Sequence, residues 1–178
     1  MSRTAVEALV ESIRIKREFF ERNREAISSQ AVLLAATLRR GNKMIAFGNG
    51  GSASDAQRAA GYLLRKGASA VALPALFHVD GPSYASLYQA VRRKGDCALA
   101  ISTSGNSNNV ILAVQAAQEF GDPVIAFTGN SGGRLRGLVP GALVVGDAST
   151  KFSVARIQEV HLMLVHELCA IAFSILNG

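Results

Sequence analysis

Five short, wholly apolar segments that alternate with helix-like segments constrain the fold of this chain more than any other feature. The apolar segments predict strands at residues 43–47, 70–73, 97–101, 124–128 and 142–145. Helical patterns lie between them, at residues 55–66, 83–94, 108–120 and 133–138. A strand that is apolar on both sides is buried on both faces, and its alternation with helices is typical of a parallel sheet. We therefore predict an α/β fold in which helices cover both faces of a parallel sheet.

Helical patterns also occupy both ends of the chain. One runs over residues 4–26, and a second is predicted to begin near Ser28, an N-cap residue type, and to end at Gly41. Ser153 opens a long final helix that runs to Leu176. Because no linker or repeat interrupts this pattern, we predict one domain over residues 1–178, in which residues 1–41 form a helical pair used in oligomerisation.

The apolar side chains at the two ends predict a homo-oligomer, a homotetramer in our interpretation. They are more numerous than one thin sandwich can cover, and exposed apolar patches of that size mark interfaces. The residues on which this depends are Phe19, Phe20, Ile171, Phe173 and Ile175.

Composition and charge exclude several other classes of protein. The 178 residues are 49% hydrophobic and 18% charged, which is typical of a globular domain. The net charge of +6 raises the possibility of nucleic-acid binding. However, the basic residues are spread along the chain and alternate with glutamates near the N-terminus, so we predict a solvated helix face and no direct nucleic-acid contact.

No apolar run reaches roughly 18 residues and no signal-peptide core is present, so we expect no membrane span and a cytoplasmic location. Cys97 and Cys169 lie in apolar surroundings and are predicted to be buried free thiols.

The sequence STSGNS, at residues 102–107, predicts a phosphate-binding loop between a strand and a helix. Backbone N–H groups converge at a helix N-terminus, where the helix dipole favours negative charge. The alternative is an ordinary N-cap, but one helix needs only one capping hydroxyl. Here four hydroxyl groups cluster, on Ser102, Thr103, Ser104 and Ser107.

The sequence GNGGSAS, at residues 48–54, is a second candidate anion-binding loop. It lacks the G-x-G-x-x-G pattern of dinucleotide sites and no P-loop lysine follows it, so we prefer a small phosphorylated molecule to a nucleotide as the ligand.

Gln158 and His166 lie eight residues apart in the final helix, on overlapping faces two turns apart. His161 projects on the other side of Gln158. For either histidine the alternative is a hydrogen-bonded helix residue without chemistry.

Taken together, these motifs resemble the sugar isomerase (SIS) domain, and within it the phosphoheptose isomerase branch. The resemblance is carried by GNGGSASDAQ at residues 48–57, KGDCALAISTSGNSNNV at 94–110, TGNSGG at 128–133 and RIQEVH with His166 at 156–166. It implies a flavodoxin-like αβα sandwich around a five-stranded parallel sheet, assembled as a homotetramer with active sites between subunits. It also implies conversion of sedoheptulose 7-phosphate to a manno-heptose 7-phosphate, a step toward lipopolysaccharide heptose.

The same resemblance assigns roles to individual residues. His166 is the implied catalytic residue, and Gln158 joins it in completing the site from the long helix. The implied phosphate and substrate contacts are Asn49, Gly50, Gly51, Ser52, Ser102, Thr103, Ser104 and Ser107.

The chain departs from the family pattern at the next helix. In the family this helix carries a histidine and, four residues later, a glutamate. These two residues hold zinc together with the glutamine and the histidine of the long helix. The glutamate is also the family's expected base. This chain has Arg58 and Tyr62 instead. A charged guanidinium cannot bind a metal and a phenol is a poor base at neutral pH, so we expect no zinc and no other cofactor. Only Gln158 and His166 are retained. Arg58 is a candidate electrostatic substitute for the metal; the alternative is that it pairs with Asp55.

These departures leave two hypotheses open. The first is a divergent isomerase that borrows a base from a neighbouring chain or from a catalytic paralogue in a mixed oligomer. The alternative is a non-catalytic adaptor or sugar-phosphate sensor, like the related DnaA initiator-associating protein. Asp80, in a stretch shorter than the family's, is a candidate replacement for a family aspartate that shapes the sugar site.

Overall fold

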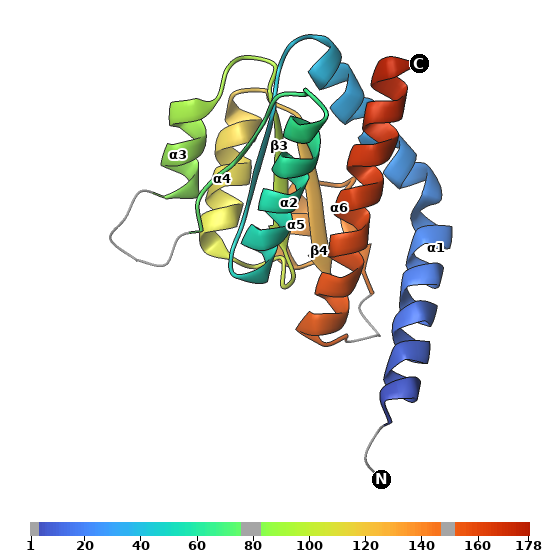
Figure 1. The fold of residues 1–178 in the computed structure, drawn as a ribbon. Coiled ribbons are helices and arrows are strands. Elements are labelled where there is room, and N and C mark those ends of the chain that lie inside the picture. The colour runs from blue at the N-terminus through green and yellow to red at the C-terminus, as the bar shows by residue number, and fades with distance from the viewer. Residues whose placement is uncertain (1–3, 76–82, 147–151) are drawn as a thin grey trace.

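The computed structural model describes residues 4–75, 83–146 and 152–178. Five strands form one parallel sheet in the order β2-β1-β3-β4-β5, and helices cover both of its faces (Figure 1). The elements are α1 (Ala5–Arg39), β1 (Met44–Gly48), α2 (Gly51–Arg65), β2 (Ala70–Ala72), α3 (Tyr84–Val91), β3 (Cys97–Ser102), α4 (Asn108–Glu119), β4 (Val124–Gly129), α5 (Gly133–Leu138), β5 (Leu143–Val145) and α6 (Val154–Asn177). The predicted αβα sandwich around a five-stranded parallel sheet is confirmed.

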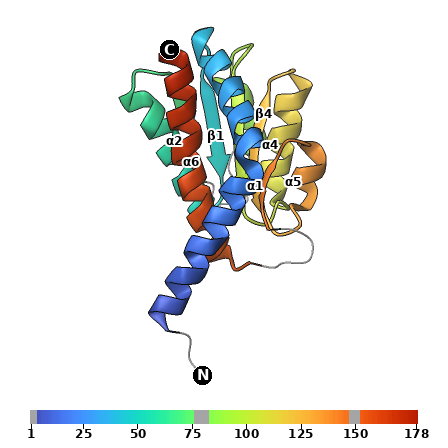
Figure 2. The same cartoon turned by 90° about the vertical axis from the view of Figure 1, so that its right-hand side faces the viewer.

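Two hydrophobic cores lie on opposite faces of the sheet. Helices α1, α2 and α6 lie on one side of the sheet, and α3 and α4 lie on the other (Figures 1 and 2). The core under the first group includes Leu34, Leu63 and Leu164, and the core under the second includes Phe47 and Tyr88. Side chains of a strand point alternately to the two faces, which is why every strand reads as apolar throughout. Each fully buried large apolar side chain stabilises the fold by about 1.5–3 kcal/mol relative to its exposed state.

The N-terminal region is one helix of 35 residues, so the predicted helical pair is wrong. Ser28 was expected to cap a second helix, but its hydroxyl donates to the carbonyl of Arg24, 3.0 Å away and one turn back. The hydroxyl of Ser29 bonds in the same way to the carbonyl of Glu25. Serine can satisfy its hydroxyl inside a helix by this route, so α1 continues through both residues. Gly41 follows the helix end with φ 78°, as expected of a C′ glycine.

The final helix, α6, begins after Ser153, whose side chain caps it by accepting from the Arg156 N–H. Among the described residues it is the one helix that is long and apolar enough to cross a membrane by length and composition. In the structure its apolar face, including Leu164 and Leu168, packs into the core beside α1 and α2.

Of the residues on which the oligomer prediction depended, one is buried and four are partly exposed. Phe19 is buried, and Phe20, Ile171 and Ile175 pack against the same core. Phe173 is half-buried, with the ammonium of Lys66 5.5 Å from its ring centroid. Helices α1 and α6 cover part of these side chains, and Phe20 and Ile171 line a groove between them, so the oligomer stays a prediction. The exposed large apolar residues of these helices are different: Val6, Leu9, Val10, Ile13, Val32, Val154, Leu162 and Met163.

Candidate functional site

The sheet contains a topological switch point between β1 and β3. These neighbouring strands pair in parallel, but the chain leaves β1 through α2 toward β2 and leaves β3 through α4 toward β4. The two helices therefore lie on opposite faces of the sheet. Ligands of open α/β sheets bind beyond the carboxyl ends of the strands at such a point. Both candidate anion-binding loops end there.

The loop after β3 presents hydroxyl groups that do not cap α4. Ser102 is buried at the end of β3, and its Oγ lies 3.1 Å from the Oγ of Ser107. Ser107 occupies the N-cap position of α4, yet its side chain makes no capping hydrogen bond. The first N–H groups of a helix have no carbonyl partner within that helix. Ser107 is therefore not an ordinary side-chain cap. The hydroxyls of Ser102 and Ser104 instead accept within the turn, from the N–H groups of Gly105 and Asn106 at 3.2 Å, and the Val110 N–H donates to the Asn109 side chain at 3.0 Å.

The loop after β4 supports the loop after β3. Gly105 has φ 66°, and a Cβ atom there would lie 1.9 Å from the carbonyl oxygen of Gly132, so no larger residue fits. The Gly105 carbonyl accepts from the Leu135 N–H at 2.9 Å. The Asn106 side chain accepts from the Arg134 N–H at 3.0 Å. The TGNSGG motif is thus explained by its packing against the Ser102–Ser107 turn.

The loop after β1 is shorter than the sequence suggested. Helix α2 begins at Gly51, not at Asp55, and its N-cap is Gly50 with φ 53°. Ser52 is buried in the first turn of the helix, where its N–H bonds to the carbonyl of Asn49 at 2.9 Å. Because a glycine with positive φ can start the helix, no hydroxyl cap is needed and the polar stretch becomes helical.

Asn49 and Asn109 link the two loops across the switch point. Each side-chain amide donates to the other, and both bonds measure 2.9 Å. Asn109 lies in the first turn of α4, within the same SGNSNNV stretch that carries the loop hydroxyls. The sequence analysis did not single out Asn109, and the only available signal was the pair of consecutive asparagines.

Tyr84 also fixes the position of the first loop. Its side chain, fully buried on α3, donates from its hydroxyl to the carbonyl of Gly48 at the end of β1. A Cβ atom on Gly48 would lie 2.5 Å from the carbonyl oxygen of Ile101, so the end of β1 is held closely against β3. The sequence analysis missed this residue because a tyrosine in a helix gives no signal of its partner.

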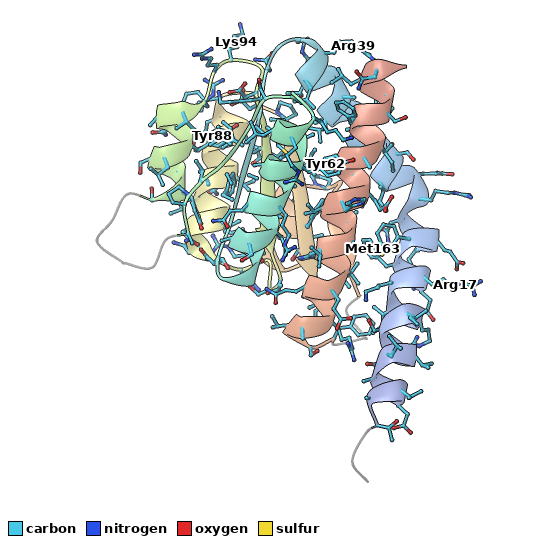
Figure 3. The ribbon with its side chains drawn as sticks, viewed as in Figure 1. Arg17, Arg39, Tyr62, Tyr88, Lys94 and Met163 are labelled. Carbon is cyan, nitrogen blue, oxygen red and sulfur yellow. The ribbon has the colours of Figure 1, made fainter. Side chains whose placement is uncertain are left out.

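Helices α2 and α6 meet along a seam that holds the remaining candidates. Gln158 lies over the start of α2, where a Cβ atom on Gly51 would be 1.8 Å from its Nε2. At the far end of the seam the ring of Tyr62 meets that of His166, and Figure 3 shows Tyr62 on the side of α2 that faces α6. Eight residues of helix rise by about 12 Å, so Gln158 and His166 of one chain do not converge on one point.

Asp55 and Arg58 line a groove between these ends of the seam. The other residues of the groove are Gly51, Ser54, Ala155, Gln158, Glu159 and Leu162. Asp55 is 5% exposed, and its Oδ2 is buried without a hydrogen-bond partner among the residues that the structure describes. Burial raises the pKa of this carboxyl to about 6, although the charge of Arg58 acts in the opposite direction. No ion pair joins Asp55 to Arg58, so the simple pairing considered for Arg58 is not formed.

His161 is a core residue. It is fully buried, and its Nε2 lies 3.1 Å from the Thr128 carbonyl, to which it donates because a carbonyl can only accept. Within the described part of the chain its Nδ1 has no hydrogen-bond partner. Burial lowers the pKa of His161 to about 4, so the ring is neutral at physiological pH. The interpretation as a hydrogen-bonded helix residue without chemistry fits this histidine.

The residues at the positions where the resemblance expects zinc differ from a usual set of zinc ligands. They hold a guanidinium, a phenol, an amide and an imidazole, on Arg58, Tyr62, Gln158 and His166. A catalytic zinc needs about three suitable protein ligands in near-tetrahedral geometry. The described residues contain no group of three His, Cys, Asp or Glu side chains that could hold a metal. The donor set does not fit zinc, and none of the chemistry below involves it.

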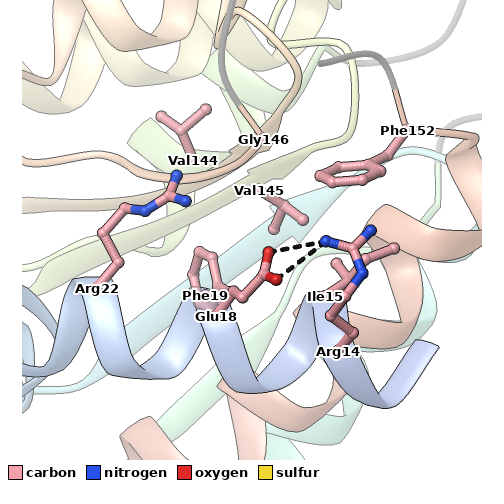
Figure 4. A pocket seen from close by; sticks show the side chains of 9 residues that line it. All are labelled: Arg14, Ile15, Glu18, Phe19, Arg22, Val144, Val145, Gly146 and Phe152. Carbon is pink, nitrogen blue, oxygen red and sulfur yellow. Dashed lines mark hydrogen bonds and ion pairs between the residues drawn. The ribbon is translucent and has the colours of Figure 1, made fainter. Parts of the chain in front are cut away.

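A separate pocket lies between α1 and the end of β5 (Figure 4). Arg14, Arg22 and Phe19 of α1 line it together with Val145 of the edge strand. The Nη1 of Arg14 is paired with Glu18 at 2.9 Å. Because β5 is separated from β3 by β4, this pocket is not part of the switch-point site.

The candidate replacement Asp80 lies outside the described residues.

Comparison with known proteins agrees with this geometry. The SIS domain family matches residues 9–129. The phosphoheptose isomerase of Thermodesulfovibrio yellowstonii is 36% identical, with 95% of this chain and 90% of that protein covered. The phosphoheptose isomerase of Shewanella sp. strain ANA-3 is 39% identical over 92% of this chain and 90% of its own length. The solved structure of phosphoheptose isomerase GmhA from Neisseria gonorrhoeae superposes with a TM-score of 0.82 at 34% identity, covering 95% of this chain and 96% of that one. The chain therefore belongs to the SIS domain family, in its phosphoheptose isomerase branch.

Proposed function

We propose that this chain binds a phosphorylated sugar, with the phosphate group at residues 102–107 against the start of α4. The observation that carries the proposal is the pair of hydroxyls on Ser102 and Ser107, 3.1 Å apart at a helix N-terminus that neither of them caps. The names of the relatives support a sugar phosphate, and sedoheptulose 7-phosphate is the first ligand to test.

Phosphate suits this loop for electrostatic reasons. Residues 102–110 contain no carboxylate, and the guanidinium of Arg134 lies 3.4 Å from the Asn108 side chain at the first residue of α4. The helix dipole adds partial positive charge at the same place. Hydrogen bonds to a charged acceptor contribute roughly 1.5–3 kcal/mol each, so a few donors suffice for useful affinity.

The sugar would extend from this phosphate across the Asn49–Asn109 pair toward α2. Gly50 has open space where a side chain would stand, whereas Gln158 lies over Gly51. The groove with Asp55 and Arg58 continues from that point. Arg58 is exposed, so its guanidinium can serve the bound sugar where the family uses a metal.

We further propose that the chain acts in the cytoplasm as a homotetramer. The exposed apolar stripe of α1, with Val6, Leu9, Val10 and Ile13, supports self-association. The partly exposed Phe20 and Ile171, which line a groove between α1 and α6, add to the same support.

Isothermal titration calorimetry tests the proposed function. Sedoheptulose 7-phosphate should bind, and unphosphorylated sedoheptulose should bind at least tenfold more weakly because the phosphate makes most of the charged contacts. Replacing Ser104 and Ser107 together by Ala should also weaken the sugar phosphate at least tenfold. The matched control replaces Ser28 and Ser29 by Ala, since these two exposed serines lie on α1. Equal affinity for both sugars, or an unchanged affinity of the Ser104→Ala/Ser107→Ala variant, would contradict the proposal.

A further inference from the structure

We propose that Asp55 and Arg58 form a metal-free catalytic pair for ketose–aldose isomerisation, in which Asp55 transfers the proton and Arg58 holds the charge on the carbonyl oxygen. This inference rests on the proposed function, because it requires a sugar phosphate bound at the switch point.

Asp55 differs from the other buried carboxylates of the described chain. Asp96 accepts hydrogen bonds from the backbone of Lys43 and from its ammonium group. Asp122 accepts from Tyr88 and, through both oxygens, from Arg92. Asp55 is as deeply placed, at 5% exposed, but its Oδ2 has no partner. An unbonded buried carboxyl destabilises a fold, so a purely structural role does not explain it.

The position of Asp55 points to the bound sugar. Asp55 lies one turn along α2 from Gly51, which begins the helix directly after the Asn49 loop. Asn49 is bonded to Asn109 beside the proposed phosphate loop. A sugar anchored by its phosphate at α4 would therefore direct its other end along α2, into the groove that Asp55 lines.

Arg58 supplies the positive charge in the same groove. It lies three residues beyond Asp55, a spacing that places two side chains on neighbouring positions of one helix face. It makes no ion pair within the described part of the chain. A guanidinium is always charged and presents fixed donors, so it can hold an oxyanion without a metal.

Glu159 is the other carboxylate of the groove, and it is already engaged. It accepts a hydrogen bond from Ser12, and it forms ion pairs with Lys16 at 3.3 Å and with Arg156. These contacts hold it toward α1 as a carboxylate. Asp55 is thus the groove carboxylate that is free to exchange a proton.

The reaction needs only proton transfers. The Asp55 carboxylate removes a proton from C1 of the ketose, a C1–C2 double bond forms, and the C2 oxygen becomes an oxyanion beside Arg58. The Asp55 carboxylic acid exchanges its proton with solvent while the enediolate persists, and then protonates C2 to form the aldose or C1 to re-form the ketose. The C1 hydroxyl proton passes to the C2 oxygen as the C1 carbonyl forms, so no oxidant or reductant is required. Burial raises the pKa of Asp55 to about 6, which keeps both of its forms accessible near neutral pH.

The test is exchange of the C1 hydrogen with solvent. The full chain, treated with a chelator, is incubated with sedoheptulose 7-phosphate in heavy water, and deuterium at C1 and the aldose product are followed by NMR. We expect exchange by the wild type, and a loss of roughly 100-fold or more in Asp55→Asn, because general-base catalysis contributes about that much. Arg58→Gln should exchange at least tenfold more slowly. In calorimetry, Asp55→Asn should keep its affinity for the sugar phosphate within about threefold.

Two control variants report unspecific effects of charge removal. Arg65→Gln removes an exposed arginine of the same helix, and Glu119→Gln removes an exposed carboxylate on α4; both should exchange like the wild type. Two results for the wild type would overturn the proposal: binding of the sugar phosphate without exchange while the chelator is present, or exchange that appears only after zinc is added. Exchange at the wild-type rate in Asp55→Asn and Arg58→Gln would overturn it as well. Absence of binding in calorimetry would instead show that the proposed function itself fails, and this inference with it. Arg58 is exposed, so its variant keeps the test valid even if Asp55→Asn does not fold.

Discussion

The ring of Tyr62 meets the ring of His166 edge to face, with centroids 5.4 Å apart and ring planes at 79°. Tyr62 stands where the resemblance leads us to expect a glutamate, and here it makes an aromatic contact between α2 and α6. His166 is otherwise solvated, with 64% of its side chain exposed and Glu167 3.5 Å away. Within one chain the seam between these helices is therefore held by packing at this end.

This contact predicts different effects for two Tyr62 variants. Tyr62→Phe keeps the ring, and its free energy of unfolding should stay within about 0.5 kcal/mol of the wild type, as for a peripheral change. Tyr62→Ala removes the ring pair and part of the core packing, and should lose about 1–3 kcal/mol. Urea unfolding followed by circular dichroism measures both. Equal losses in the two variants would mean that the hydroxyl, not the ring, makes the contact that matters.

The metal content of the purified protein tests the loss of the family's zinc site. We expect well under one equivalent of zinc per chain, because Arg58 would repel a divalent cation by roughly 8 kcal/mol at about 4 Å and an effective dielectric near 20. Mass spectrometry of a tag-free sample after dialysis against zinc provides the number, with His166→Ala as the control. About one equivalent in the wild type, lost in His166→Ala, would contradict this account.

Asp55 and His161 predict opposing pH dependences of stability. The pKa of Asp55 is raised from 3.8 to about 6, so its contribution is fully present below pH 3.8 and is lost as pH rises through 6. The pKa of His161 is lowered from 6.5 to about 4, so its contribution is present above pH 6.5 and is lost as pH falls through 4. Each amounts to about 3 kcal/mol at 1.36 kcal/mol per pKa unit, and over pH 4–6 they largely cancel.

Removing either group should therefore expose the other. In Asp55→Asn the free energy of unfolding should rise by about 3 kcal/mol between pH 4 and pH 6.5, and in His161→Gln it should fall over pH 4–6. Urea titrations at a series of pH values measure these slopes, which do not depend on the overall stability of each variant. Parallel curves for the wild type and Asp55→Asn would show that Asp55 titrates normally.

Self-association should depend on the exposed stripe of α1. Val10→Glu combined with Ile13→Glu places two charges among side chains that are 60% and 56% exposed, so the monomer fold should tolerate them. Light scattering at micromolar concentration should give a tetramer for the wild type and a smaller species for this variant. A monomeric wild type would remove the oligomer from the account, and an unchanged tetramer in the variant would place the interface elsewhere.

Much of the fold could be predicted from the sequence because the strands are buried on both faces and therefore read as unbroken apolar segments. The helix boundaries were less accurate where one residue type has two uses. Ser28 can cap a helix or bond back within it, and only the tertiary structure selects the second. Gly50 starts α2 through a positive φ that the sequence does not reveal.

The candidate site was predictable where the signal is local and not where it depends on long-range contacts. The hydroxyls of residues 102–107 are adjacent in sequence, so their clustering was visible. The Asn49–Asn109 pair joins residues 60 apart, and the Tyr84–Gly48 bond joins residues 36 apart, so neither could be inferred. The burial of Asp55 was equally hidden, because the sequence suggested that this residue opens the helix instead of facing α6.

A crystal structure of the chain with sedoheptulose 7-phosphate tests the central claim most directly. We predict the phosphate group within hydrogen-bonding distance of the Ser102 or Ser107 hydroxyl and of the first N–H groups of α4, with the C1–C2 end of the sugar beside Asp55 and Arg58. A phosphate bound elsewhere, such as between Arg14 and Arg22 in the pocket at β5, with the switch point left unoccupied, would contradict it.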